Sequence, residues 1–178
     1  ISRFPFLDHG FYRYSLNGQP EDLRRGDYYG GKGLAWVRVE TPLGALDFYN
    51  THMIAPYMEI GSDVYYHHRV AQAYELAQWI NHQSEATPVI LTGDLNCTPV
   101  DLPYRTARTY AKLRDSYLEA HPDNPGYTVS TAIPYLLTHA PERIDYVMYR
   151  SSPGSSLQLR SAELAFNLLP QEYANQML

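Results

Sequence analysis

The sequence predicts an α/β fold built on a mixed β-sheet, and three observations lead to it. A long amphipathic helix is predicted near the middle of the chain, and short strands are predicted before and after it. A short apolar strand at 88–92 looks buried on both faces, which suits the middle of a sheet that is covered on both sides. The resulting order, β-β-α-β-α-β-β, is typical of a mixed-sheet α/β sandwich.

A β-hairpin is predicted near the start of the chain. Proline and glycine interrupt residues 1–30, which we expect to form loops with short strands. Residues 34–39 and 45–50 have the alternating pattern of strands. The Thr-Pro-Leu-Gly turn at 41–44 lies between them, so the two strands are expected to pair as a hairpin.

The clearest helix is expected to run from residue 63 to about residue 83. Asp63 would be its N-cap, because the carboxylate can accept a hydrogen bond from a free backbone N–H. Side chains suited to burial recur there at steps of three and four residues, which predicts one buried face. The members of this predicted face are Tyr66, Val70, Ala73, Ala77 and Ile80.

The second half of the chain is predicted to contain more helix and two further strands. Residues 101–120 are expected to be mostly helical, with a break near Lys112. A loop-rich stretch follows at 121–142. Residues 144–149 and 157–166 are predicted to be strands.

The composition restricts the class of protein. The chain has 178 residues, of which 44% are hydrophobic and 19% charged, so it fits one folded domain and not a disordered tail, a collagen-like rod or a coiled coil. The net charge of −5 offers no basic surface to a nucleic acid. The single cysteine, Cys97, excludes an internal disulfide and a cysteine-rich zinc site. No apolar run approaches the roughly 18 residues of a membrane span.

The strongest candidate for a chemical site follows the strand at 88–92. The sequence Gly-Asp-Leu-Asn at 93–96 places an acid and an amide two residues apart. In extended backbone, alternate side chains share a face, so Asp94 and Asn96 would point to one site. A carboxylate there can orient or deprotonate water, and an amide can bond a phosphate oxygen. An ordinary Gly-Asp turn would use the same residues.

Two further candidates lie at strand ends. His52 follows the second hairpin strand and could transfer protons, or it could be a hydrogen-bonded structural histidine. Asp145 interrupts an apolar strand, and an unpaired buried charge is costly. Its partner would be either a histidine that it orients or a nearby arginine in a salt bridge.

A glycine-rich loop at 26–33 precedes the first hairpin strand. Its glycines would let the backbone approach a ligand, and Lys32 could meet a phosphate. The spacing differs from that of an ATP-binding P-loop, and a strand follows where a P-loop needs a helix. Taken alone, the segment is better explained as an ordinary glycine-rich loop.

The order of these motifs resembles the endonuclease/exonuclease/phosphatase superfamily. The matching segments are Thr-His at 51–52, Gly-Asp-Leu-Asn at 93–96 and Arg-Ile-Asp-Tyr at 143–146. Two more segments, at 27–33 and 68–78, resemble neutral sphingomyelinases. The resemblance implies a DNase I-like four-layer sandwich of two mixed β-sheets flanked by helices. It also implies Mg²⁺-dependent hydrolysis of sphingomyelin to ceramide and phosphocholine.

The resemblance also implies roles for individual residues. Asp94 would activate or orient the attacking water, and Asn96 would help to hold the phosphate. His52 would stabilise the phosphoryl oxygens, and Asp145 would orient a catalytic histidine. Charge neutralisation, an oriented water and hydrogen bonds to the oxygens are what hydrolysis of a phosphodiester requires.

Other features of the family bear on regulation and completeness. Asp27 and Lys32 would correspond to a mobile Asp–Lys pair that regulates access or activity. The chain begins at Ile1, and it contains neither the family's acidic Mg²⁺ ligand, which we expect upstream, nor its Ser-Asp-His segment. We therefore expect residues 1–178 to form a single but partial domain that is nearly inactive in isolation.

Two alternatives to the sphingomyelinase prediction are a DNase-like or abasic-site nuclease of the same superfamily and an inactive lipid- or protein-binding module. The acidic balance favours a phospholipid such as sphingomyelin at a membrane surface over nucleic acid. We expect no obligate protein partner. The expected location is membrane-associated and intracellular, with any anchor outside this chain.

Overall fold

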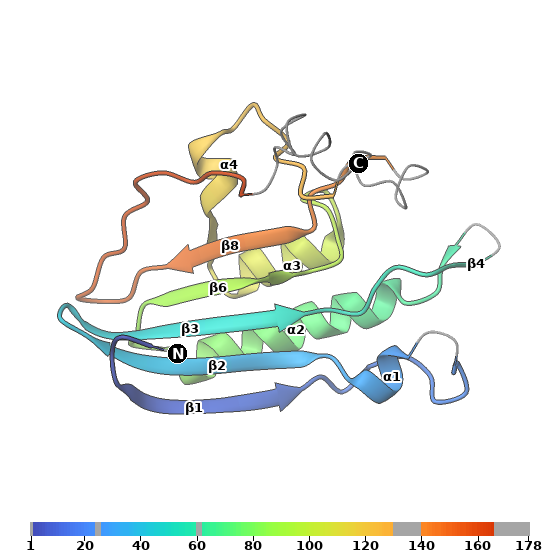
Figure 1. Cartoon of the computed structure of the whole chain (residues 1–178), viewed down its shortest axis with the longest axis horizontal. Helices are drawn as coiled ribbons and strands as arrows, with labels where there is room; N and C mark the ends of the chain where they lie inside the picture. Colours follow the sequence, from blue (N-terminus) through green and yellow to red (C-terminus); the bar gives the residue numbers. More distant parts are fainter. Residues whose placement is uncertain (1, 24–25, 60–61, 130–139, 166–178) are drawn as a thin grey trace, which may run out of the picture.

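A computed structural model of the chain describes residues 2–23, 26–59, 62–129 and 140–165. Its main feature is a mixed six-stranded sheet with the strand order β1-β2-β3-β6-β8-β7 (Figure 1). In that order the strands are β1 (Phe6–Arg13), β2 (Gly33–Thr41), β3 (Gly44–His52), β6 (Val89–Asp94), β8 (Asp145–Arg150) and β7 (Arg114–Asp115). The two-stranded sheet consists of β4 (Met58–Glu59) and β5 (Ser62–Asp63). The helices are α1 (Asp27–Gly30), α2 (Tyr66–Gln83), α3 (Leu102–Tyr110) and α4 (Ser116–Ala120).

Helices α2 and α3 cover one face of the large sheet (Figure 1). The core lies between this helical layer and the sheet, where apolar side chains of both are removed from water. Its fully or nearly fully buried members include Leu34, Tyr49, Leu76, Ile80, Leu91 and Met148. The predicted α/β class with a mixed sheet is therefore confirmed, and so is the hairpin of β2 and β3.

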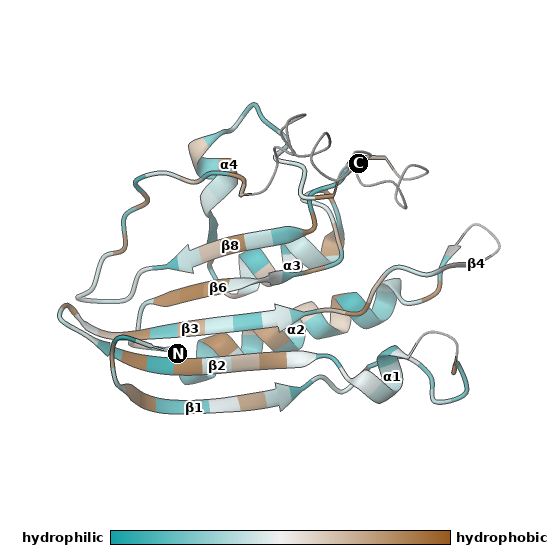
Figure 2. Cartoon of the chain, viewed as in Figure 1, coloured by the Kyte–Doolittle hydropathy of each residue, from teal (hydrophilic) through white to brown (hydrophobic). Residues whose placement is uncertain are grey.

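The other face of the large sheet is open in the part of the chain that the structure describes. Phe11, Phe48 and Val147 point to this face and are 66%, 36% and 52% exposed. Figure 2 shows that apolar positions recur along all the long strands of the sheet. The described residues thus form one helical layer and one large sheet of the expected four-layer sandwich.

The strand β6 has the predicted central place, but only one of its faces is fully buried. Val89 and Leu91 point to the helices and are completely buried, whereas Ile90 is only half-buried on the open face. The prediction of burial on both faces was wrong for the described part of the sheet, because the strand's apolar run does not show what covers each side.

Two other local predictions differ from the structure, and a third is confirmed. Residues within 1–30 were expected to be loops with short strands, yet eight of them form β1, an edge strand paired to β2. No strand forms over the described residues 157–165, and Phe166 lies outside the described part. The predicted break near Lys112 is confirmed, since this residue has a left-handed φ of 55° and separates α3 from β7.

The helix α2 begins after Asp63, and this residue is not its N-cap. Tyr65 precedes the first helical residue and makes no side-chain capping bond. The Asp63 carboxylate instead accepts a hydrogen bond from the Tyr65 N–H at 3.1 Å and forms an ion pair with Arg69. The buried face of α2 also differs, because Arg69, Gln72 and Leu76 belong to it, whereas the predicted members Tyr66 and Val70 are only half-buried.

The described helices are too short or too polar to cross a lipid bilayer. This finding concerns the described ranges of the chain alone.

Candidate active site

The strand register brings the predicted catalytic residues to one end of the sheet. His52 is the last residue of β3, Asp94 the last of β6 and Asp145 the first of β8. His52 is paired with Asp94 across the parallel β3–β6 ladder, and Asp94 is paired with Asp145 across the antiparallel β6–β8 ladder. Because directly paired residues lie within a few ångströms of each other, three segments far apart in the sequence supply one cluster.

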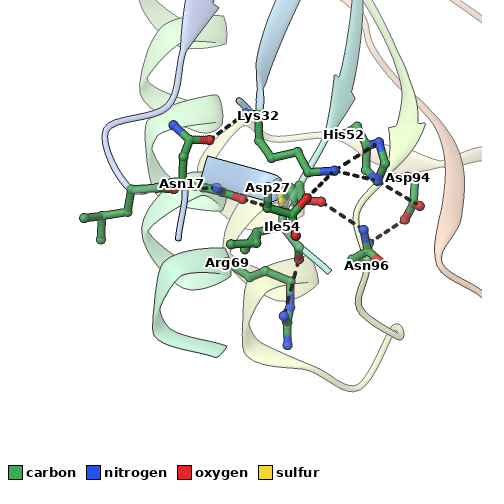
Figure 3. Close-up of polar contacts among 11 residues, drawn as sticks. Asn17, Asp27, Lys32, His52, Ile54, Arg69, Asp94 and Asn96 are labelled. Atoms are coloured by element: carbon green, nitrogen blue, oxygen red, sulfur yellow. Dashed lines mark hydrogen bonds and ion pairs between the residues drawn. The ribbon is translucent and has the colours of Figure 1, made fainter. Parts of the chain in front are cut away.

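A chain of contacts joins the loop at 26–33 to this cluster (Figure 3). The Lys32 ammonium lies 3.1 Å from an Asp27 carboxylate oxygen and 3.2 Å from His52 Nε2. His52 Nε2 in turn lies 3.4 Å from Asp94 Oδ2. The predicted regulatory pair and the predicted catalytic residues therefore belong to one site.

The His52 ring contacts both of its neighbours through Nε2. This nitrogen lies 3.2 Å from the Lys32 ammonium and 3.4 Å from Asp94 Oδ2, and Nδ1 lies 3.5 Å from the same ammonium. A neutral imidazole carries one N–H donor and one acceptor nitrogen, so the tautomer decides whether Nε2 donates to Asp94 or accepts from Lys32. The histidine side chain is 56% exposed, so its edge is accessible to a substrate.

The pKa of the Asp94 carboxyl group is raised. Burial is the largest cause, because it disfavours the charged form, and the nearby Asp145 carboxylate adds to it. The Asn96 N–H, His52 and Lys32 act in the opposite direction. A carboxyl group held between an ammonium, an imidazole and a second acid is suited to proton transfer.

Asn96 is near Asp94, but strand alternation does not place it there. The strand β6 ends at Asp94, and Asn96 has a left-handed φ of 49°, so the backbone has already turned. The Asn96 N–H donates to Asp94 Oδ1 at 2.7 Å, and its side-chain Nδ2 donates to the Met53 carbonyl oxygen at 2.9 Å. The extended-backbone prediction was wrong for this pair, because a turn replaces the strand.

Asp145 is exposed, which corrects the expectation of a buried acid that needs a histidine or an arginine partner. Its neighbour Arg143 is buried and pairs with Asp115, with nitrogen–oxygen distances of 3.1 Å. The side chain of Asp145 points to the open face of the sheet, where water solvates it, and its backbone N–H donates to Thr128 Oγ1 at 3.2 Å.

The cluster opens into a pocket of about 970 Å³. Its lining includes His52, Asp94 and Asp145, the aromatic side chains of Tyr117 and Tyr127, and a segment at 159 and 161–165. The volume is at the upper end of the range that small-molecule sites occupy, roughly 300–1,000 Å³. Charged groups and aromatic rings on one wall suit a ligand with a phosphate and an apolar or cationic part.

Sequence reasoning missed two residues that hold the site together. Asn17 is buried, and its Oδ1 accepts a hydrogen bond from the Lys32 N–H at 2.6 Å. Thr128 Oγ1 accepts from the N–H groups of both Ile144 and Asp145 at the start of β8. The Asn-Gly pair at 17–18 signals a turn, which could have indicated Asn17, whereas Thr128 has no local signal.

The described residues do not fit a magnesium site by themselves. Among residues 2–23, 26–59, 62–129 and 140–165, no group of three or more His, Cys, Asp or Glu side chains can hold a metal ion. Asp94 and Asp145 offer carboxylate oxygens, which Mg²⁺ prefers, but two carboxylates alone leave most of its octahedral positions to other ligands.

Comparisons with known proteins agree with this geometry. The profile of the Endonuclease/Exonuclease/phosphatase family matches residues 1–159. Human sphingomyelin phosphodiesterase 2 is 34% identical over 92% of this chain and 41% of its own length. The inositol phosphosphingolipids phospholipase C of Schizosaccharomyces pombe is 33% identical over 69% of this chain and 29% of its own length.

A solved structure shares the fold. Sphingomyelinase C from Streptomyces griseocarneus superposes with a TM-score of 0.60 at 18% identity, covering 84% of this chain and 50% of that one. The chain thus spans half or less of the length of each of these three proteins.

Proposed function

Because the chain belongs to the Endonuclease/Exonuclease/phosphatase family, we propose that the whole protein is a Mg²⁺-dependent phosphodiesterase that hydrolyses sphingomyelin to ceramide and phosphocholine. The likeness to human sphingomyelin phosphodiesterase 2 supports a sphingolipid substrate. The observation that carries the proposal is the contact chain of Lys32, His52 and Asp94, in which His52 and Asp94 line the pocket.

The chemistry assigned to these residues follows from their positions. Hydrolysis of a phosphodiester needs an oriented water and hydrogen bonds to the phosphoryl oxygens. Asp94, whose pKa is raised, would accept the proton of the attacking water or orient it. Lys32 and His52, which lie beside Asp94, would donate to the phosphoryl oxygens.

Asn96 and Asp145 complete the proposed roles. The Asn96 backbone N–H fixes the Asp94 carboxylate, and the Asn96 side chain bonds the Met53 carbonyl oxygen. The contact of the Asn96 side chain with a phosphate stays a prediction. Asp145 would orient a catalytic histidine from its exposed position. Among the described residues, no histidine forms a hydrogen bond or ion pair with the Asp145 side chain. Mg²⁺ would neutralise phosphoryl charge when bound, with its main acidic ligand outside the described residues.

A membrane surface is the proposed place of action, because sphingomyelin is a bilayer lipid. The proposal needs neither nucleic acid nor a protein partner. An intracellular, membrane-associated location is part of the same proposal.

The test is an assay of the whole protein on three substrates: sphingomyelin vesicles, inositol phosphosphingolipid vesicles and duplex DNA. We expect Mg²⁺-dependent release of phosphocholine that chelation by EDTA stops and that Asp94→Ala lowers by at least about 10²-fold. Preferential release of inositol phosphate would move the headgroup assignment to the other lipid, and DNA cleavage without lipid hydrolysis would favour a nuclease. Activity on none of the substrates would favour a binding module.

The isolated chain of 178 residues provides a second arm of this test. We expect it to be nearly inactive, because its described residues do not complete a metal site. Robust hydrolysis by this chain, abolished by Asp94→Ala, would contradict that expectation while supporting the assignment of Asp94.

A further inference from the structure

The side chain of Gln72 is a fully buried carboxamide on α2 that the chemistry above does not use. A buried amide is costly unless its polar atoms are hydrogen-bonded. Its Oε1 accepts from the Ile54 N–H at 2.9 Å, and its Nε2 donates to the Leu16 carbonyl oxygen at 2.6 Å. Since one partner is a donor and the other an acceptor, the two ends of this amide cannot be exchanged.

One of these partners belongs to the segment that follows His52. The Met53 N–H donates to the Asp94 carbonyl oxygen at 3.0 Å, and the Met53 carbonyl oxygen accepts from Asn96 Nδ2 at 2.9 Å. Gln72 therefore holds, from the helix side, the same segment that Asp94 and Asn96 hold from the sheet side.

The other partner belongs to the segment that supports Lys32. Leu16 directly precedes Asn17, whose Oδ1 accepts from the Lys32 N–H at 2.6 Å and whose Nδ2 bonds the Tyr14 carbonyl oxygen. The Lys32 side chain then reaches His52, as Figure 3 shows. One carboxamide thus bonds both of the backbone segments whose side chains meet at the Lys32–His52 contact.

The neighbours of Gln72 on α2 act on the same two segments. Arg69, three residues earlier, donates to the Ile54 carbonyl oxygen at 3.4 Å. Glu75, three residues later, accepts from the Ser15 N–H at 2.9 Å. Residues at steps of three lie on one side of a helix, so α2 presents a row of polar side chains to the two segments behind the site.

We infer that Gln72 is a positioning residue, which sets the distance between the Lys32 ammonium and the His52 ring by fixing the two segments that carry them. The effect of Gln72 on the position of the two segments rests on its hydrogen bonds alone. Its effect on catalysis also rests on the proposed function. An apolar side chain of similar size would leave one buried donor and one buried acceptor unpaired, and the two segments would move to find other partners.

The informative variant is Gln72→Glu, studied at a pH high enough to ionise the new carboxyl group itself, because burial raises the pKa of a carboxyl group. One glutamate oxygen can still accept from the Ile54 N–H, but the other faces the Leu16 carbonyl oxygen, so two acceptors oppose each other. The Leu16–Asn17 side is then released while the Ile54 side is kept. Gln78→Glu is the matched control, because it makes the same change at an exposed position of the same helix.

The first readout is independent of activity. In the whole protein, NMR signals of the His52 ring, assigned with His52→Gln, report on the contact with Lys32. We expect Gln72→Glu to shift these signals and Gln78→Glu to leave them unchanged. Asn17→Ala, which removes the bond to the Lys32 N–H itself, should reproduce the shift and replaces Gln72→Glu if that variant does not fold.

The second readout is the hydrolysis of sphingomyelin vesicles by the whole protein, below its unfolding temperature. We expect Gln72→Glu to lower kcat by about tenfold or more with little change in KM, because the reacting groups and not the binding surface are displaced. Unchanged His52 signals and unchanged kcat in a folded variant, with only a lower Tm, would overturn the inference. If the wild-type protein hydrolyses no sphingomyelin, the proposed function fails, and the NMR comparison still decides the role of Gln72.

Discussion

Gly93→Ala should damage the site and the sheet together. Gly93 lies between Leu91 and Asp94 on β6 and is paired with Thr51 on β3. An alanine Cβ at this position would lie 2.1 Å from the Thr51 carbonyl oxygen and 2.9 Å from the Thr51 carbonyl carbon. Backbone atoms cannot rotate away, so the strands would have to separate by about 1 Å at this rung.

The size of the effect follows from this displacement. Overpacking of a closed site costs about 1–3 kcal/mol of unfolding free energy. In a domain of this size each kcal/mol lowers Tm by about 2–4 °C. The next rung of the same ladder pairs His52 with Asp94, and a displacement of about 1 Å in reacting groups can lower the rate by about 10²-fold.

The assay compares thermal unfolding and sphingomyelin hydrolysis of Gly93→Ala with those of Gly44→Ala. Gly44 also has a positive φ, 109°, but an added Cβ there meets no atom within 4 Å. The control therefore has the conformational strain without the clash. The reasoning is refuted if Gly93→Ala matches the wild-type protein in Tm and rate, or if Gly44→Ala has the same losses.

Three further predictions concern burial and charge. Asp47→Ala should lower the unfolding free energy by about 1.5–3 kcal/mol. The buried Asp47 carboxylate accepts two hydrogen bonds from Arg38, at 2.7 and 2.8 Å, and the half-buried guanidinium would lose both. Urea titration would measure the loss, and a value below about 1 kcal/mol would contradict the prediction. Folding raises the pKa of Asp94, so ionisation of this group opposes folding as the pH rises from its unfolded to its folded pKa. Asp94→Asn should therefore have a higher Tm than the wild-type protein at neutral pH but not in acid, and a pH-independent difference would contradict this. Burial raises the pKa of the Cys97 thiol to about 12, so a disulfide reagent should label it only on unfolding, and rapid labelling of the folded chain would contradict this.

Local patterns predicted much of the fold. The hairpin of β2 and β3 and the long helix α2 follow from periodicity and a turn, which are properties of neighbouring residues. The start of α2 was misjudged because the Asp63 carboxylate forms an ion pair with the Arg69 guanidinium instead of capping the helix. The long strand β1 was not predicted, because its sequence lacks a regular alternating pattern and its extended backbone depends on pairing with β2.

The candidate site was predicted residue by residue but not as an arrangement. Strand ends identified His52, Asp94 and Asp145, and a glycine-rich loop identified Asp27 and Lys32. Their contact could not be predicted from spacing, because it depends on the register of β3, β6 and β8. The ion pair of Arg143 with Asp115 could not be predicted either, since Asp115 lies 28 residues earlier in the chain.

The sequence by itself determined the α/β class, the order of the main elements and the residue types that phosphodiester chemistry needs. It could do so because hydrophobic periodicity, turns and short motifs are encoded over a few residues. Only the tertiary structure decided that Lys32 reaches His52, that Asn96 turns away from the strand direction and that Gln72 bonds two distant segments. These contacts depend on strand pairing and helix packing across the whole sheet. A single carboxamide or carboxylate lies next to its partner only because those long-range contacts bring the two segments together.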